Sequence, residues 1–394
     1  DAVTPRAAYS DKNTLHGALA NFIKNNPQYP WSTVLMQVQG KPVHAGFQKS
    51  TSFVMAQDLP TQYYLKDRSG KPVVYSARKW LSPLMPLDII QKDGKTSAFY
   101  LDQLVKFTGL APALINENGE SFGHFRQEAL LKQDGQVYAH FKGSGLSLPC
   151  YSGWFQHRLD STYRAAVMER FNASKTHFSF YNLSATQAAY WPCYEHRRTL
   201  NRWGNGCYST PDFYPNNPAN WRTASGGFNG YGPVALGRVK EISLGDKLFS
   251  PFVSGGWSEE ERNIRPAQWL ALLKAMIMLG ADFFYVGYFN VTLPGGKWPN
   301  GVGPFDPRGY AYQVAMPAYA QAIGSYVRQF ITEGELLNTA KPGDPINQFR
   351  FKGNAENELI LVRKLGKKYL IYGSIQPNNN LQGNVPAQVI TQIR

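Results

Sequence analysis

The stretch from residue 250 to residue 290 constrains the fold most, because two apolar strand-like runs flank a helix that is apolar on more than one side. The helix is predicted to begin at Pro266, where the missing N–H is not needed, and to end at Gly280, a residue suited to the position after a helix. Its apolar side chains are Trp269, Leu270, Leu272, Leu273, Met276, Ile277 and Leu279. Such a helix is buried, and the strands that it joins are expected to form a right-handed βαβ unit.

Short apolar runs alternate with helical stretches and Gly/Pro/Asn-rich loops from Trp31 to about Leu336, which is typical of parallel α/β structure. Strands are predicted at residues 33–38, 73–76, 112–115, 178–182, 249–254 and 281–289. A linker at 341–345 then leads into short strands separated by Asn/Gly turns, predicted at 349–351, 358–365, 368–374 and 388–393. We therefore expect a main α/β domain at 1–340 and a small antiparallel β appendage at 341–394.

The charge of the chain favours a polyanionic partner. Lys and Arg number 41 against 27 Asp and Glu, for a net charge of +14, which suits nucleic acid, anionic lipid or acidic polysaccharide, or else reflects a basic surface with no dedicated partner. The basic residues are scattered and no RRM-type aromatic motif or helix-turn-helix is present, so nucleic acid is not expected. No apolar run approaches the ~20 residues that span a bilayer, so we expect no membrane span.

Metal and cofactor chemistry is not indicated. The three cysteines, Cys150, Cys193 and Cys207, have neither Cys-x-x-Cys nor zinc-finger spacing, and they allow at most one disulfide within the chain. Dinucleotide, P-loop, zinc-protease and nucleophile-elbow motifs are all missing from the sequence. We therefore expect no cofactor and no bound metal.

Localisation is inferred indirectly. The chain opens at Asp1 without Met, which we interpret as a processed or trimmed product. Three glycosylation acceptor patterns begin at Asn172, Asn182 and Asn290, and they give weak support for secretion. We expect a secreted or extracellular protein, with the periplasm as one such location. The sequence leaves the oligomeric state open.

The most informative polar segment follows the apolar run at 112–115. Asn116, Glu117, Asn118 and Glu120 place two carboxylates and two amides where a barrel strand would end, the position at which barrel enzymes carry out their chemistry. A Glu packed there under aromatic side chains would have a raised pKa and could donate a proton to a glycosidic oxygen. The alternative is a polar β-turn with an exposed Glu, since Asn-Gly is a common turn pair.

Asn116-Glu117 after an apolar strand resembles the Asn-Glu pair that closes the fourth strand in the clan of retaining (β/α)8 glycoside hydrolases. The runs Ser-Pro-Phe-Val-Ser-Gly-Gly-Trp at 250–257, Asn-Ile-Arg-Pro-Ala-Gln-Trp at 263–269 and Gly-Ala-Asp-Phe-Phe-Tyr at 280–285 look like the last two strands of such barrels in agarase- and carrageenase-like proteins. The resemblance covers about residues 60–330. It implies a (β/α)8 TIM-barrel-like main domain with Glu117 as the acid/base, which Asn116 would orient.

The sequence departs from the clan at the seventh strand, whose tip should carry the nucleophile Glu. Here the run at 252–257 contains no carboxylate. The candidates for the second acid are Glu259, Glu260, Glu261, Glu120 and Glu195. A retaining mechanism needs the two carboxyl groups about 5 Å apart and an inverting one roughly 6.5–9.5 Å. The alternatives are that the acids at 259–261 only favour the dipole of the following helix, or that the chain is not catalytic.

Aromatic and basic side chains in the predicted loops are consistent with a glycan. Trp191, Tyr194 and Trp257 would stack on sugar faces, and each could instead anchor its loop. Arg197 follows closely, and a guanidinium group suits bidentate binding of sulfate or carboxylate, unless it lies on a solvated helix face. The sequence therefore predicts a glycoside hydrolase that acts on a polysaccharide, an anionic (sulfated) galactan. The alternative is a non-catalytic extracellular glycan-binding or structural protein that kept the barrel and lost one carboxylate.

Overall fold

The computed structural model describes residues 15–36, 59–75, 78–118, 127–180, 207–208, 212–213, 252–254, 274–281, 285–287, 324–338 and 358–375. The chain forms two compact units, Asp1–Leu183 with Pro192–Tyr208 and Ser184–Trp191 with Ser209–Arg394. Helices and parallel strands are mixed in both units, so the predicted α/β class is confirmed. The closed barrel and the domain boundary at 340–341 stay predictions.

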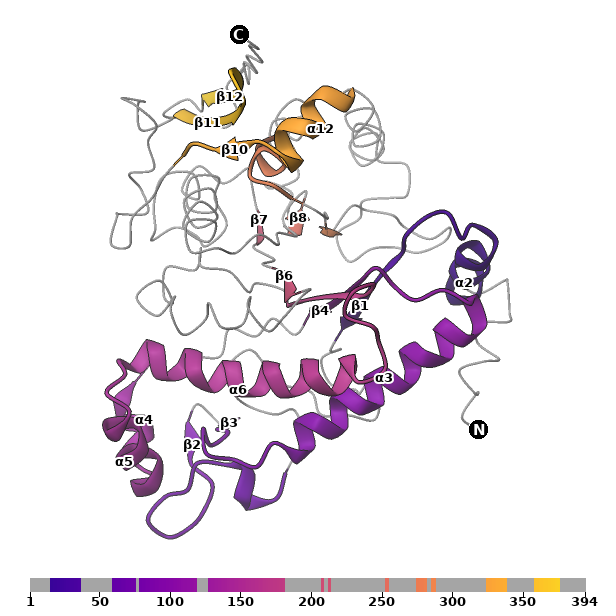
Figure 1. Ribbon diagram of the computed structural model, residues 1–394. Coiled ribbons are helices and arrows are strands. Elements are labelled where there is room, and N and C mark those ends of the chain that lie inside the picture. The colour runs from indigo at the N-terminus through magenta and orange to yellow at the C-terminus, as the bar shows by residue number, and fades with distance from the viewer. Residues whose placement is uncertain are drawn as a thin grey trace, which may run out of the picture. The chain divides into compact units, whose positions relative to one another are not determined.

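The first unit is built on a parallel sheet. Its strands are β1 (Ser32–Met36), β4 (Leu114–Asn118), β5 (His177–Phe180) and β6 (Cys207–Tyr208). They neighbour one another in the order β1-β4-β5-β6, and every pairing is parallel (Figure 1). Neighbours in chain order are what consecutive units of a (β/α)8 barrel produce, whereas a doubly wound sheet reverses its order at a switch point.

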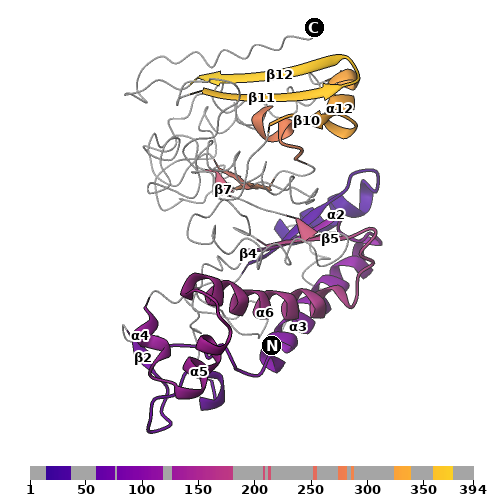
Figure 2. The ribbon, with the colours of Figure 1, turned by 60° about the vertical axis from the view of Figure 1, so that its left-hand side comes forward.

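Two long helices precede the inner strands. α3 (Asp88–Thr108) leads into β4 and α6 (Leu148–Met168) leads into β5, and the two helices pack against each other. Figures 1 and 2 both show them side by side on the same side of the sheet, and α2 (Leu15–Asn25) packs on α3. α3 ends at Gly109, whose φ of 75° lies in the left-handed region that favours glycine. Ser147 caps the start of α6 by accepting a hydrogen bond from the Cys150 N–H.

The core of this unit joins the sheet to both helices. Ile115 of β4, Phe155 of α6 and Phe178 of β5 are each 0% exposed and belong to one apolar cluster. Where the helices meet, Tyr163 donates a buried hydrogen bond of 2.9 Å from its hydroxyl to Ser97 Oγ. Each fully buried large side chain contributes roughly 1.5–3 kcal/mol, so this cluster holds β4 in place between its neighbours.

Two segments that follow strands of the sheet pack together as what we call the loop subdomain, residues 59–85 with α4 (Glu128–Leu131) and α5 (Gly135–Gly143). A 3-10 helix at Thr61–Tyr63 opens the first segment. The strand predicted at 73–76 forms as β2 (Val74–Tyr75), but it pairs antiparallel with β3 (Arg78–Lys79) and is no part of the parallel sheet. Its placement among the parallel strands is therefore wrong, because its backbone pairs with the neighbouring strand β3.

The second unit contains the βαβ pairing that the sequence predicts. β7 (Asp212–Phe213), β8 (Phe252–Ser254) and β9 (Tyr285–Gly287) are parallel, in that order. The helix before β9 is described from residue 274, and it ends at Gly280 with φ 85°, as predicted. No helix within the described ranges combines the length and apolarity that a bilayer crossing requires.

An antiparallel sheet follows α12 (Gly324–Thr332). Its strands are β10 (Glu335–Leu336), β11 (Glu358–Leu365) and β12 (Lys368–Ile375), in that order (Figure 2). The predicted strands at 358–365 and 368–374 and their antiparallel pairing are confirmed. The strands predicted at 349–351 and 388–393 lie outside the described residues.

One buried residue links this sheet to two helices. The guanidinium of Arg363 is buried and donates hydrogen bonds to the carbonyls of Met278, Phe330, Ile331 and Gly334 at 2.7–3.3 Å. These carbonyls belong to the helix before β9, to the last turn of α12 and to Gly334 just after it. β11 therefore packs on both helices through this one side chain.

Candidate functional site

The amino end of β4 is held by hydrogen bonds to both neighbouring strands. The Ala113 N–H donates to the Trp31 carbonyl, and the His177 N–H donates to the Ala113 carbonyl, each at 2.8 Å. The buried Thr176 hydroxyl donates to the Pro112 carbonyl at 2.8 Å. Because β4 is anchored on both sides before it begins, its register toward the carboxyl end is determined.

Asn116 and Glu117 lie at that carboxyl end. Asn116 pairs with Val34 of β1 and Ser179 of β5, and Glu117 pairs with Leu35 and with Phe180, the last residue of β5. The strand continues through Asn118 instead of stopping at residue 115 as predicted. Asn116 and Glu117 therefore lie in a strand that is paired on both sides. The alternative of a polar β-turn at the Asn-Gly pair extends beyond the described residues and stays open. The catalytic role of Glu117 stays a prediction.

The other residues predicted for the site lie outside the described residues. These are Glu120, Trp191, Tyr194, Glu195, Arg197, Trp257, Glu259, Glu260 and Glu261. β8 is described as far as Ser254, and the sequence after it contains no carboxylate before Glu259. The structure thus gives the strand position of Glu117, and the roles of both acids stay predictions.

Asn172 is the one glycosylation acceptor pattern within the described residues, in an exposed turn between α6 and β5. Its side-chain oxygen accepts hydrogen bonds from the Ser174 N–H at 2.9 Å and from the Ser174 hydroxyl at 2.7 Å. The side chain therefore stabilises the turn. Asn182 and Asn290 lie outside the described residues.

An aromatic cluster that the sequence did not indicate joins the loop subdomain to α6. His140 Nδ1 lies 2.9 Å from the hydroxyl of Tyr151, and the Trp154 ring stacks on Tyr151 with centroids 5.1 Å apart. Burial raises the pKa of Tyr151 to about 12, although the nearby Arg158 guanidinium lowers it. The hydroxyl therefore stays neutral across the physiological range and acts as a structural hydrogen-bonding group.

Arg158 extends this cluster to the segment before α3. Its guanidinium lies 5.3 Å from the Trp154 ring centroid and donates hydrogen bonds to the carbonyls of Pro83 and Met85. Desolvation lowers the pKa of Arg158, yet an arginine remains charged in proteins. The cation therefore clamps residues 83–85 onto α6.

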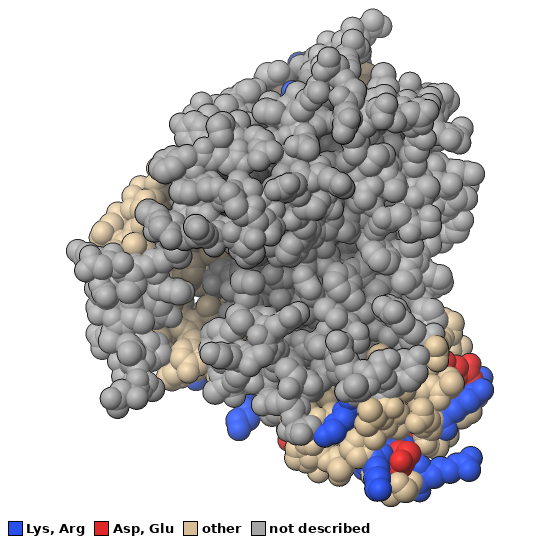
Figure 3. Space-filling view, turned by 180° about the vertical axis from the view of Figure 1, so that it is seen from behind, with Lys and Arg blue, Asp and Glu red and all other residues tan. Residues whose placement is uncertain are grey.

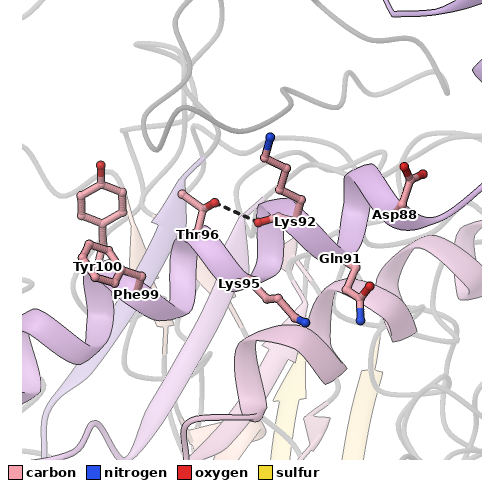
Figure 4. A pocket seen from close by; sticks show the side chains of 7 residues that line it. All are labelled: Asp88, Gln91, Lys92, Lys95, Thr96, Phe99 and Tyr100. Carbon is pink, nitrogen blue, oxygen red and sulfur yellow. Dashed lines mark hydrogen bonds between the residues drawn. The ribbon is translucent and has the colours of Figure 1, made fainter.

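A surface hollow of about 380 Å³ runs along α3 and is lined by Asp88, Gln91, Lys92, Lys95, Thr96, Phe99 and Tyr100. Figure 4 shows Lys92, Thr96 and Tyr100 projecting to one side of the helix and Gln91 and Lys95 to the other. None of the residues predicted for the site lines it. A ligand site normally collects polar groups that converge from several elements, so we assign no role to this single-helix surface.

Metal-ligating side chains do not gather in the described part of the chain, where no group of three or more His, Cys, Asp or Glu could hold an ion. Cys150 is disulfide-bonded. Since the chain has two other cysteines, the partner is Cys193 or Cys207. The cross-link uses the single disulfide that the sequence allows.

Comparison with known proteins identifies no family. No protein-family model matches the chain, and no curated protein matches it. One solved structure with a similar arrangement is the ligand-free form of cyclic α-maltosyl-(1→6)-maltose hydrolase from Arthrobacter globiformis, at 12% identity and a TM-score of 0.37. The match covers 91% of this chain and 64% of that protein, so the chain spans less than two thirds of its length. A likeness at this level carries no argument about function.

Proposed function

We propose that this protein is a glycoside hydrolase that cleaves an acidic polysaccharide, a sulfated galactan, with Glu117 as the acid/base. The observation that carries the proposal is the position of Glu117, at the carboxyl end of a parallel strand that has a parallel neighbour on each side. Strands with neighbours in chain order, as in this sheet, place their carboxyl ends where barrel enzymes bind substrates. Asn116, one position earlier, would orient the acid.

The proposed chemistry needs two carboxyl groups. Glu117 would donate its proton to the glycosidic oxygen as the bond to the anomeric carbon breaks. The second carboxylate would attack that carbon, or activate a water molecule that does so, and the candidates are Glu259, Glu260, Glu120 and Glu195. If a glycosyl-enzyme ester forms, water hydrolyses it and Glu117 accepts the proton of that water.

The choice of an anionic substrate is supported by charge. The net charge of +14 attracts sulfate or carboxylate groups, and Arg197 offers a guanidinium that can bind them bidentately. Trp191, Tyr194 and Trp257 are the proposed platforms for sugar rings. The disulfide at Cys150 supports an oxidising location, as expected of a secreted or extracellular enzyme.

The test compares purified wild type with Glu117→Gln on neutral and sulfated galactans and measures new reducing ends. Wild type should cleave a sulfated galactan, and the variant should be slower by roughly 10²–10⁴-fold, the usual contribution of general acid/base catalysis. Glu169→Gln is the matched control, because Glu169 is an exposed glutamate whose ion pair with Lys95 is long at 3.8 Å. Equal rates for wild type and Glu117→Gln would refute the assignment of the acid.

A second candidate is a glycan-binding protein of the same fold without catalysis. It is favoured by the sequence at the end of β8, where no carboxylate occurs between Phe252 and Trp257. This candidate predicts binding of the same galactans by both wild type and Glu117→Gln, with no reducing ends from either.

A further inference from the structure

The topology of the first unit places the loop subdomain at the carboxyl edge of the sheet. Residues 59–85 lie between β1 and α3, and α4 and α5 lie between β4 and α6. In parallel sheets, a segment that leaves a strand toward the following helix begins at the carboxyl edge, the edge at which Glu117 lies. Loops in this position usually carry binding function. The loop subdomain is thus made from two segments of the kind that shapes substrate sites.

One part of the loop subdomain is an exposed basic turn, residues 66–71, which we call the cationic turn. Lys66, Arg68 and Lys71 are all exposed. The turn closes with a hydrogen bond of 2.9 Å from the Gly70 N–H to the Asp67 carbonyl, and Gly70 adopts φ 80°. Three cationic side chains therefore leave one tight turn of six residues.

The carboxylate of Asp67, the acidic residue of the turn, accepts hydrogen bonds from other groups of the same turn. Asp67 Oδ1 accepts hydrogen bonds from the Ser69 hydroxyl at 2.7 Å, the Ser69 N–H at 2.8 Å and the Lys71 N–H at 3.0 Å. The Ser69 hydroxyl, followed by the Lys71 N–H, holds the pKa of Asp67 below its usual value. The carboxylate thus stabilises the backbone of the turn, and the cations point to solvent around it.

The turn is fixed to the rest of the unit. Asp134 Oδ2 accepts a hydrogen bond from the Lys66 N–H at 2.9 Å, while Oδ1 of the same residue caps α5 through the Gln136 and Val137 N–H groups at 3.1 Å. The Tyr63 hydroxyl donates to the Asp88 carboxylate at the start of α3. Because α3 leads into β4, the cationic turn is positioned relative to the strand that carries Glu117.

Further lysines lie on the helices of the loop subdomain. Lys132 and Lys142 share one carboxylate, Glu128, at 3.8 and 3.3 Å. Figure 3 shows Lys and Arg side chains, with Asp and Glu side chains among them, on the described surface at the lower right. The two lysines and Glu128 together therefore add one net positive charge to the loop subdomain.

We infer that the cationic turn is a second binding surface for an acidic polysaccharide, separate from the catalytic residues, which holds the sulfate or carboxylate groups of the chain beyond the cleavage site. Because the backbone of the turn is already ordered, only the Lys and Arg side chains lose conformational entropy when they bind an anion. Residues 66–71 contain no aromatic side chain, so the base stacking that single-stranded nucleic acid uses is missing. The orientation toward the substrate rests on the proposed function, whereas the binding itself can be measured without catalysis.

The experiment compares two triple variants of equal charge, both in the Glu117→Gln background so that cleavage during the measurement is slowed. The first is Lys66→Gln, Arg68→Gln and Lys71→Gln. The matched control is Lys24→Gln, Lys175→Gln and Lys367→Gln, three other exposed lysines outside the loop subdomain. Far-UV circular dichroism and melting temperature establish that both are folded, since all six side chains are at the surface. Binding of a sulfated galactan, of neutral agarose oligosaccharides and of a DNA oligonucleotide is then measured between 50 and 200 mM salt.

The turn variant should bind the sulfated galactan at least about tenfold more weakly at low salt, and its salt dependence should fall by about 2 in log–log slope, because released counterions scale with the contacts made. The control should stay within about twofold of its parent, and neutral oligosaccharides should not distinguish the variants. Equal weakening of both triple variants would overturn the inference, because net charge alone would then explain binding. Tighter binding of DNA than of the galactan, lost in the turn variant, would overturn the class of partner. A lack of hydrolysis by wild type would refute the proposed function and leave this result unaffected.

Discussion

Replacing Gly94 with Ala tests the contact between α3 and α6 that positions β4. A Cβ on Gly94 would lie 2.7 Å from Ala166 Cβ and 2.7 Å from the Tyr163 carbonyl oxygen, where ordinary contacts are 3.4–4 Å. Neither neighbour can yield, because one is a Cβ atom and the other belongs to helix backbone. The helices must therefore separate by roughly 1 Å, and overpacking of this kind costs about 1–3 kcal/mol.

Two further effects contribute to the net change in the free energy of unfolding. The buried hydrogen bond between Tyr163 and Ser97, 2.9 Å long, lies one turn along α3, and its loss would add about 1–2 kcal/mol. Alanine, on the other hand, is a better helix former than glycine by up to about 1 kcal/mol. We expect Gly94→Ala to lower the free energy of unfolding of the first unit by about 2–3 kcal/mol, the sum of these opposing terms.

Gly143→Ala is the matched control, since a Cβ on Gly143 in α5 would meet no atom within 4 Å. It should leave stability unchanged or raise it by up to about 1 kcal/mol. Urea unfolding followed by circular dichroism gives the change, and hydrogen exchange of peptides from residues 88–108 and 148–168 assigns it to the two helices. A Gly94→Ala protein as stable as wild type would show that α3 and α6 do not meet at this glycine, and the reasoning would fail.

Arg363→Met should lower the free energy of unfolding of the second unit by about 3 kcal/mol, because carbonyls of the helix before β9 and of α12 lose a charged donor. Urea unfolding measures the change, with the surface variant Lys364→Met as the control. Stability should also fall as pH rises from 10 toward 12, by up to about 2 kcal/mol, because Tyr151 with a folded pKa of about 12 stays protonated where the unfolded chain has begun to ionise. The stability that comes from the neutral Tyr151 hydroxyl is fully present below pH 10 and is lost as the pH rises toward 12. The Tyr151→Phe variant should lack this fall in stability, and an unchanged pH dependence in that variant would contradict the prediction.

Local patterns in the sequence correctly predicted elements whose formation depends on a few neighbouring residues. The helix end at Gly280 formed as predicted, because a glycine in the left-handed conformation ends a helix through its own backbone. The hairpin of β11 and β12 also formed as predicted, because its two strands are joined by a short turn and pair with each other. The strand at 73–76 also formed, but its partner was wrong. Pairing depends on which strand approaches, and short segments do not encode that choice.

At the candidate site, too, local sequence patterns predicted one part and the pairing between strands decided the rest. An apolar run followed by polar residues correctly indicated Glu117 at the end of a strand, but the strand extends further than its apolar residues do. Backbone pairing with β1 and β5 carries it through Asn118, because hydrogen bonds to two neighbours do not require apolar side chains. The sequence did not predict the cationic turn, because the sequence of a few basic loop residues does not show whether the turn is held in place by the rest of the unit.

By itself, the sequence determined the α/β class, the position of an acid at a strand end and the basic charge of the molecule, because periodicity, turn residues and composition are local or additive properties. Only the tertiary structure decided the order of the parallel strands, the antiparallel pairing of β2 with β3 and the attachment of the cationic turn to α5 through Asp134. Those features depend on contacts between residues far apart in the chain, and such contacts form only when the whole unit has folded.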